Sequence, residues 1–80
     1  MPSKAYLLIK ADVGKVNEVI NSLKQLDGVE VADPVNHKYD VIAVLEEDNI
    51  KDLSDLLTSK IKSIPHISKL DSCFRLAGLT

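Results

Sequence analysis

The two histidines, His37 and His66, are the side chains of this sequence best suited to bind a metal ion or to act as acids and bases near neutral pH. His37 lies in the stretch VNHKYD, between the apolar runs VEVADPV and VIAVLEE, a pattern that predicts a tight turn. Such turns need positive φ, which Asn and His adopt more often than most other non-glycine residues. A zinc site needs several ligands, each about 2 Å from the ion. We interpret His37 as a turn residue and expect no metal site.

The acidic run EED and the single cysteine are the other groups that suggest chemistry. Glu46, Glu47 and Asp48 precede a predicted helix, where the macrodipole favours carboxylates without any catalytic role. Cys73 has no His, Asn or second Cys placed to activate it. The sequence also lacks a Gly-rich phosphate loop, a nucleophile elbow and an HExxH motif. We therefore expect no catalytic residue, no cofactor and no enzyme activity.

Length and composition predict a single globular domain that spans residues 1–80. The chain is 45% hydrophobic and 28% charged, which is typical of a folded protein and not of a disordered one. Its ten basic residues are scattered and its net charge is −2, so we expect no direct contact with nucleic acid. The first apolar run, AYLLI, is too short for a signal peptide or a membrane span. One cysteine cannot form an internal disulfide, which indicates a reducing compartment and a cytoplasmic protein.

The elements that position these residues follow from hydrophobic periodicity. Residues 5–11 have the composition of a strand, and residues 12–28 have apolar residues at helical intervals of three and four. Asp12 is the expected N-cap of this helix and Gly28 its expected C′ residue. The apolar stripe of the helix consists of Val16, Val19, Ile20, Leu23 and Leu26.

The rest of the chain predicts two more strands, a second helix and a last strand. In residues 29–35 we expect Val29, Val31 and Val35 on one side, and Pro34 suits an edge strand. Residues 39–45 are typical of a central strand, and residues 67–76 alternate as the last strand. The second helix lies between them, with Asp48 or Asn49 as its cap and Pro65 at its end, and its apolar stripe consists of Ile50, Leu53, Leu57, Ile61 and Ile64.

The order β-α-β-β-α-β predicts the α+β, ferredoxin-like arrangement. Right-handed crossovers then give a four-stranded antiparallel sheet of order 4-1-3-2 with both helices on one face. In this order the turns that hold His37 and His66 lie at opposite edges of the sheet, about 14 Å apart, which disfavours a shared metal.

The two central strands carry large apolar residues on both faces. In the first strand Leu7 and Ile9 alternate with Tyr6 and Leu8, although two helices can cover only one face. An uncovered apolar face on so small a domain predicts an interface, and a second copy packed sheet to sheet as a C2 dimer is the simplest cover. The alternative is a set of tolerated surface aliphatic residues.

Four further stretches are specific when taken together. They are GKVNEV (14–19) at a helix start, LDGV (26–29), YD (39–40) before an apolar strand, and DLSDLLTSKIKSIP (52–65). With them the chain resembles, over residues 4–76, the effector-binding or RAM domain of the Lrp/AsnC transcription regulators. The resemblance implies a dimeric α/β barrel, further assembly into rings of dimers, and a small molecule, usually an amino acid, bound between dimers. Since the chain has no residues left for the family's helix-turn-helix, the resemblance implies a stand-alone RAM protein.

The resemblance also implies where the effector binds. The family's turn before the third strand usually reads Gly-x-Tyr/Phe-Asp, and here His37 takes the glycine position while Tyr39 and Asp40 are retained. Where the family's last strand often shows Thr-x-Thr, this chain has Leu70 and Ser72. The implied ligand-binding residues are Asn36, His37, Lys38, Tyr39, Asp40, Leu70 and Ser72.

Three polar residues near this predicted pocket have alternative interpretations. Asp40 either meets the ammonium group of an amino acid or forms hydrogen bonds within the hairpin. Asp71 is a second candidate for the ammonium group, but for Asp71 and Ser72 we favour the interpretation as solvated residues of an edge strand. The Pro-Gly that commonly precedes the family's last strand is Pro65-His66 here, so His66 also stands at a glycine position.

We therefore expect an amino-acid-sensing and oligomerisation module that acts in transcription regulation without its own DNA-binding domain. Its expected partners are a second copy, a ring of dimers, an amino-acid effector and full-length Lrp/AsnC regulators, with no nucleic acid and no membrane. The alternative is a purely structural oligomerisation partner of such regulators. A small dimeric-barrel enzyme is less favoured, because the inward residues are aliphatic and both histidines lie in turns.

Overall fold

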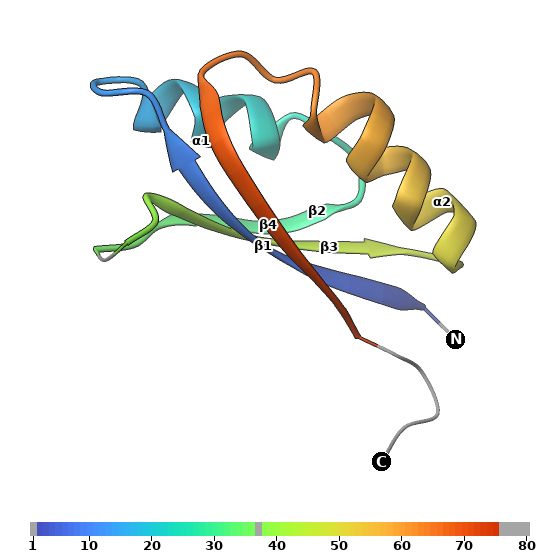
Figure 1. Cartoon of the computed structure of the whole chain (residues 1–80). Coiled ribbons are helices and arrows are strands. Elements are labelled where there is room, and N and C mark those ends of the chain that lie inside the picture. The colour runs from blue at the N-terminus through green and yellow to red at the C-terminus, as the bar shows by residue number, and fades with distance from the viewer. Residues whose placement is uncertain (1, 37, 76–80) are drawn as a thin grey trace.

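Four strands pair into one antiparallel sheet, and two helices cover one of its faces (Figure 1). The structure, a computed structural model, describes residues 2–36 and 38–75, and the elements named here lie in those ranges. They are β1 (Ser3–Ala11), α1 (Val16–Lys24), β2 (Val29–Pro34), β3 (Val41–Glu47), α2 (Ile50–Asp55), its π-helical continuation η1 (Leu56–Ile61) and β4 (Ile67–Arg75). The sheet order β2-β3-β1-β4 confirms the predicted ferredoxin-like topology.

The central strands β1 and β3 have one buried face and one open face, as predicted. Leu7 and Ile9 of β1 are 0% exposed and lie opposite Ala43 and Val41 of β3. The helices contribute further buried side chains to this core: Val19, Ile20, Leu23, Leu53, Leu56, Leu57 and Ile61. Full burial of one leucine side chain stabilises the fold by about 1.5–3 kcal/mol. The alternate residues of the same strands point to the other side of the sheet, which α1, α2 and η1 leave uncovered (Figure 1).

Helix α1 begins later than the sequence predicts. Asp12 is not the N-cap, because a turn intervenes in which the Lys15 N–H donates to the Asp12 carbonyl at 3.0 Å and Gly14 has φ +78°. Lys15 is the N-cap instead and makes no side-chain capping bond. Gly28 is not the C′ residue, because the helix ends at Lys24 and Gly28 lies in the later turn that leads into β2.

Strand β2 contains an irregularity that corrects the predicted arrangement of its valines. Val29 lies opposite Leu45, but Val31 lies opposite Val44, so one extra residue is inserted between them. Val29 therefore packs against the core, whereas Val31 is 38% exposed on the other face. The prediction that both valines share one side is wrong, because a bulge shifts the period-two alternation by one residue. Pro34 lies on an edge strand, as predicted.

The second helix is capped as predicted but has a different buried stripe. The Asn49 side chain accepts a hydrogen bond from the Asp52 N–H at 2.9 Å. Ile50, expected in the stripe, is 50% exposed at the first helical residue, so burial begins at Leu53. Leu56, which the predicted stripe left out, is also buried, and it follows Leu53 at a helical interval of three residues.

Candidate functional site

The predicted site lies at the β2–β3 hairpin, where Asp40 joins the hairpin to β1. The carboxylate of Asp40 accepts a hydrogen bond from the Ala11 N–H at 2.9 Å. Its own N–H donates to the Ile9 carbonyl at 2.8 Å, and its carbonyl accepts from the Val35 N–H at 2.9 Å. Asp40 therefore extends the β1–β3 ladder with its side chain. His37, predicted at the tip of this turn, lies outside the described residues.

Tyr39 crosses the sheet from the hairpin to the far edge strand. Its hydroxyl donates a hydrogen bond to the carboxylate of Asp71 on β4, although β1 lies between β3 and β4. Asp71 is opposite Leu8, which places the contact on the open side of the sheet. The hydrogen bond to Asp71 raises the pKa of Tyr39 above its usual value, and partial burial and the aspartate charge act in the same direction.

Three lysines lie near this tyrosine in the chain or in the sheet, and we call Lys10, Lys38 and Lys69 the lysine cluster. Lys69 lies directly opposite Lys10 on neighbouring strands, and its ammonium lies 5.7 Å from the centroid of the Tyr39 ring. The Lys10 ammonium donates to the Lys38 carbonyl at 3.5 Å. The sequence analysis selected Lys38 only, because the β1–β4 register that brings Lys10 beside Lys69 cannot be read from either strand alone.

Leu70 and Ser72 lie on the other side of the sheet from Tyr39. Leu70 is opposite Ile9 and packs against the core, and Ser72 is opposite the buried Leu7. Residues of a strand alternate between the two faces, so Asp71, and not its two neighbours, reaches the tyrosine. The structure thus brings Lys38, Tyr39 and Asp40 together at the hairpin end of the sheet. Leu70 and Ser72 of β4 lie on the covered side of the sheet and not on the open side.

His66 holds the loop before β4 against the start of α1. It has φ +72°, the only positive φ of a non-glycine residue in residues 2–36 and 38–75. This confirms that His66 occupies a position that favours glycine. Its carbonyl accepts from the Asp12 N–H at 2.8 Å, and its ring nitrogens lie 3.4 Å from an Asp12 oxygen and 3.7 Å from a Glu18 oxygen. In the described residues no three His, Cys, Asp or Glu side chains are arranged to hold a metal ion.

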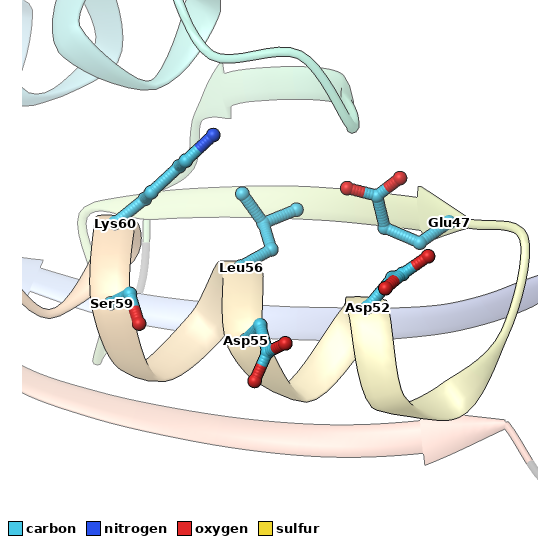
Figure 2. A pocket seen from close by; sticks show the side chains of 6 residues that line it. All are labelled: Glu47, Asp52, Asp55, Leu56, Ser59 and Lys60. Atoms are coloured by element: carbon cyan, nitrogen blue, oxygen red, sulfur yellow. The ribbon is translucent and has the colours of Figure 1, made fainter.

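Two hollows on the surface differ in what lines them. A hollow of about 310 Å³ adjoins the hairpin and is lined mainly by the β1–α1 loop, together with Lys10 and Asp40. A larger one of about 570 Å³ lies along α2 and η1, where Leu56 lies between Lys60 and the acidic pair Glu47 and Asp52 (Figure 2). In the described part of the chain, Glu47, Asp52 and Lys60 form no ion pair. The hollow beside the hairpin adjoins the predicted site residue Asp40, and a third hollow, of about 300 Å³, adjoins the predicted Leu70 and also Lys69.

The open face is the side of the sheet that the helices leave uncovered. It has an apolar centre, in which Tyr6 lies opposite Val44 and Leu8 opposite Ile42. Tyr6 and Leu8 are 40% and 39% exposed. At one end of the face lies the lysine cluster with Tyr39 and Asp71. At the other end, the Lys4 ammonium lies 3.4 Å from Glu30 and 3.5 Å from Glu46, and these carboxylates raise the pKa of Lys4.

Comparison with known proteins gives the family. No family model and no curated protein sequence matches the chain. Two solved structures are each 31% identical and cover 92% of it: the hypothetical protein PHS023 from Pyrococcus horikoshii, with a TM-score of 0.88, and FFRP-DM1, with a TM-score of 0.87. The chain spans 89% of the first and 99% of the second. FFRP-DM1 is one of the Lrp/AsnC regulators.

More distant regulators share the fold over only part of their length. Escherichia coli AsnC is 20% identical with a TM-score of 0.84, and the chain spans 50% of it. The transcriptional regulator NMB0573 from Neisseria meningitidis, solved in complex with L-Met, is 12% identical with a TM-score of 0.79, and the chain spans 52% of it. In residues 2–36 and 38–75, no helix is long and apolar enough to cross a membrane. The chain belongs to the Lrp/AsnC family of regulators and corresponds to the RAM domain of that family.

Proposed function

We propose that this RAM domain is a regulatory module that dimerises through its open face and senses a small molecule, in the first instance an amino acid, at the hairpin end of the sheet. Membership of the Lrp/AsnC regulators and the uncovered apolar centre of the sheet support the proposal. The module acts in transcription regulation through assembly with other Lrp/AsnC proteins. The single cysteine, Cys73, is free and exposed, in keeping with a cytoplasmic location.

The dimer is supported by the composition of the open face. Its centre consists of aliphatic and aromatic side chains that adjoin across β3 and β1, and contiguous apolar patches on small proteins mark interaction sites. Charged groups lie at its two ends, so a second copy that covers the centre leaves them at the rim, where they stay hydrated. When the same face of two copies forms the interface, both faces are covered at once and the assembly is a closed C2 dimer. Rings of such dimers are the next level of assembly.

The effector site is supported by the polar groups that converge beside the hairpin. The adjoining hollow of about 310 Å³ has the size of a small-molecule site, which spans roughly 300–1,000 Å³. Asp71 and Asp40 supply carboxylates for an ammonium group, and the lysine cluster supplies donors for a carboxylate. NMB0573, which shares the fold, is a regulator solved with L-Met. We keep Asn36, His37, Lys38, Tyr39 and Asp40 as proposed ligand-binding residues, with Leu70 and Ser72 proposed to contribute only from a neighbouring copy.

Sedimentation equilibrium at micromolar concentration tests the dimer. We expect the wild-type chain to sediment at twice its mass of 8.8 kDa. Leu8→Glu places a charge in the apolar centre and should give a monomer that remains folded, since Leu8 is already 39% exposed. Ile50→Glu, at a 50% exposed apolar residue on α2, is the matched control and should leave the dimer intact. A wild-type monomer at this concentration would contradict the proposal.

Thermal-shift measurements with the twenty amino acids test the sensing function. An effector that binds the folded protein stabilises it and so raises its melting temperature. At an effector concentration of one hundred times the Kd, the free energy of unfolding increases by about 2.7 kcal/mol. If none of the amino acids changes the melting temperature of a chain that still dimerises, the module serves as a structural oligomerisation partner instead.

A further inference from the structure

The lysine cluster is a concentration of positive charge without acidic partners. In residues 2–36 and 38–75, the ion pairs of lysine involve Lys4, Lys15 and Lys51, and none involves Lys10, Lys38 or Lys69. This contrasts with the chain as a whole, which has twelve acidic and ten basic residues and a net charge of −2. Acidic partners are thus available in number, but they do not lie beside these three lysines.

The nearest aspartates each bind a different donor. Asp71 accepts from the Tyr39 hydroxyl, Asp40 from the Ala11 N–H, and Asp12 lies against the His66 ring. Asp71 comes from the same strand as Lys69, and yet the structure pairs it with the tyrosine. The acidic side chains at this end of the sheet are therefore held in place by their own hydrogen bonds.

The pairing of Lys10 with Lys69 is unfavourable in isolation. Directly opposite residues of antiparallel strands have Cβ atoms about 4.5–5.5 Å apart, and like charges at this position destabilise a sheet. An anion placed between the two ammonium groups reverses the sign of this contribution. The Tyr39 ring beside the Lys69 ammonium holds that lysine at the end of the open face, toward the hairpin.

We propose that the effector of this module is an amino acid with a second carboxylate, bound with both carboxylates on the lysine cluster and its ammonium group on Asp71. This inference rests on the proposed sensing function and specifies its ligand class. A neutral amino acid brings one carboxylate and one ammonium group, which leaves one of the two opposed lysines without a partner. A dicarboxylic amino acid, with a net charge of −1, satisfies Lys10 and Lys69 together. Charge-assisted hydrogen bonds of this kind are about twice as strong as neutral ones.

Matched ligand pairs test the charge requirement. Isothermal titration calorimetry of the wild-type chain compares L-glutamate with L-glutamine and L-aspartate with L-asparagine, at constant ionic strength. Each pair has nearly the same shape and differs in the charge of one group. We expect one of the acidic amino acids to bind at least about tenfold more tightly than its amide, because the amide cannot form the second charge-assisted contact.

Matched variants test the location. Lys69→Gln and Lys10→Gln remove one charge each and should weaken binding of the acidic amino acid at least about fivefold. The variant that loses the partner of the side-chain carboxylate should weaken binding of the amide less, because the amide has only its α-carboxylate to place on the cluster. Lys60→Gln on η1 is the control, since Lys60 is an exposed lysine on a helix that covers the other face of the sheet (Figure 1). Unchanged affinity in both cluster variants would overturn the proposed site.

The same titrations separate this inference from the function on which it rests. Tighter binding of a neutral amino acid overturns the dicarboxylate class and leaves the sensing function intact. Binding of no amino acid at all overturns both. Inorganic phosphate that binds as tightly as the acidic amino acid shows a general anion site and overturns the assignment to a dicarboxylic effector.

Discussion

The two faces of the sheet show how one short run of sequence serves two purposes. Leu7 and Leu8 are neighbours in β1, and yet Leu7 is fully buried under the helices while Leu8 is 39% exposed on the open face. The same alternation in β3 buries Val41, Ala43 and Leu45 and leaves Ile42 and Val44 half-buried. The covered face completes its packing within the described residues, whereas the proposed dimer would complete the packing of the open face.

The faces also differ in where they place charge. No buried polar or charged side chain occurs on the covered side among the described residues, so its stability depends on apolar packing and on the backbone ladder. The open face has ion pairs at one end and the lysine cluster at the other. Polar groups of this kind determine which partner binds and in which orientation, because unmatched charges oppose wrong partners. We infer that the covered face determines folding and the open face determines recognition.

The largest effect is expected from replacing Leu7 by alanine, and Leu8 is the comparison. Leu7→Ala removes a fully buried side chain and leaves a cavity, which should lower the free energy of unfolding by about 2–5 kcal/mol. Leu8→Ala should lower it less, and by an amount that depends on protein concentration, since in the proposed dimer Leu8 stabilises the fold through the interface. Urea unfolding of both variants at several concentrations measures the difference. Equal, concentration-independent losses would show that the two faces do not divide the roles in this way.

Gly28 tests how closely the covered side is packed at the start of β2. Its φ is +94°, and a Cβ added there would lie 2.7 Å from Cδ2 of Leu56 and 2.8 Å from an oxygen of Glu47. Gly28→Ala should therefore lower the free energy of unfolding by about 1–3 kcal/mol, from backbone strain and from displacement of Leu56.

Gly14 is the matched control for this substitution. It has a similar φ of +78°, but no atom lies within 4 Å of an added Cβ. Gly14→Ala should cost about 1 kcal/mol through backbone strain alone. The difference between the two variants in thermal unfolding gives the contribution of packing against η1. If Gly14→Ala lowered the free energy of unfolding as much as Gly28→Ala, close packing at Gly28 would contribute nothing to the loss of stability.

Period-two alternation made the architecture predictable from the sequence. In AYLLI and VIAVL the alternate residues are apolar on both sides, which predicted the central strands and the uncovered face, while the order of the elements along the chain predicted the strand order. The predictions failed where a single residue changes the period. The insertion between Val29 and Val31 shifts β2 by one position, and the turn at Gly14 delays the start of α1. Neither changes the composition of its segment, so neither leaves a signal in hydrophobicity.

The site was predictable only in its local part. The hairpin residues Lys38, Tyr39 and Asp40 are consecutive, and their turn chemistry and family pattern identify them. The contact of Tyr39 with Asp71 joins residues that are 32 positions apart and depends on the β1–β4 register. Sequence reasoning selected Leu70 and Ser72 on β4 as ligand-binding residues, and it favoured Asp71 between them as a solvated residue over a partner for an ammonium group. A shift of one residue along a strand changes the face, and that is the error to which strand predictions are most sensitive.

The smallest expected effect concerns Tyr39, which links the hairpin to β4 across the open face. Its hydrogen bond to Asp71 raises its pKa above the usual value of about 10, because the bond holds the protonated form. The stabilisation is therefore fully present below the unfolded-state pKa and is lost as the pH rises through the raised folded-state value. Tyrosinate absorbance measures this titration, and Tyr6→Phe leaves Tyr39 as the only tyrosine of the chain.

Asp71→Asn in the same Tyr6→Phe background tests whether Asp71 is the cause of the raised pKa of Tyr39. The variant removes the charge and weakens the hydrogen bond, because an amide oxygen is a poorer acceptor than a carboxylate, so the pKa of Tyr39 should fall toward about 10. Ser72→Ala alters the next residue of β4 on the other side of the sheet and should leave the titration unchanged, because Ser72 lies opposite Leu7 and not on the open face. If both variants shifted the pKa equally, the tyrosine would be reporting the general environment of the edge strand. A shift in Asp71→Asn alone shows that the open face and the covered face remain electrostatically separate even at adjacent residues.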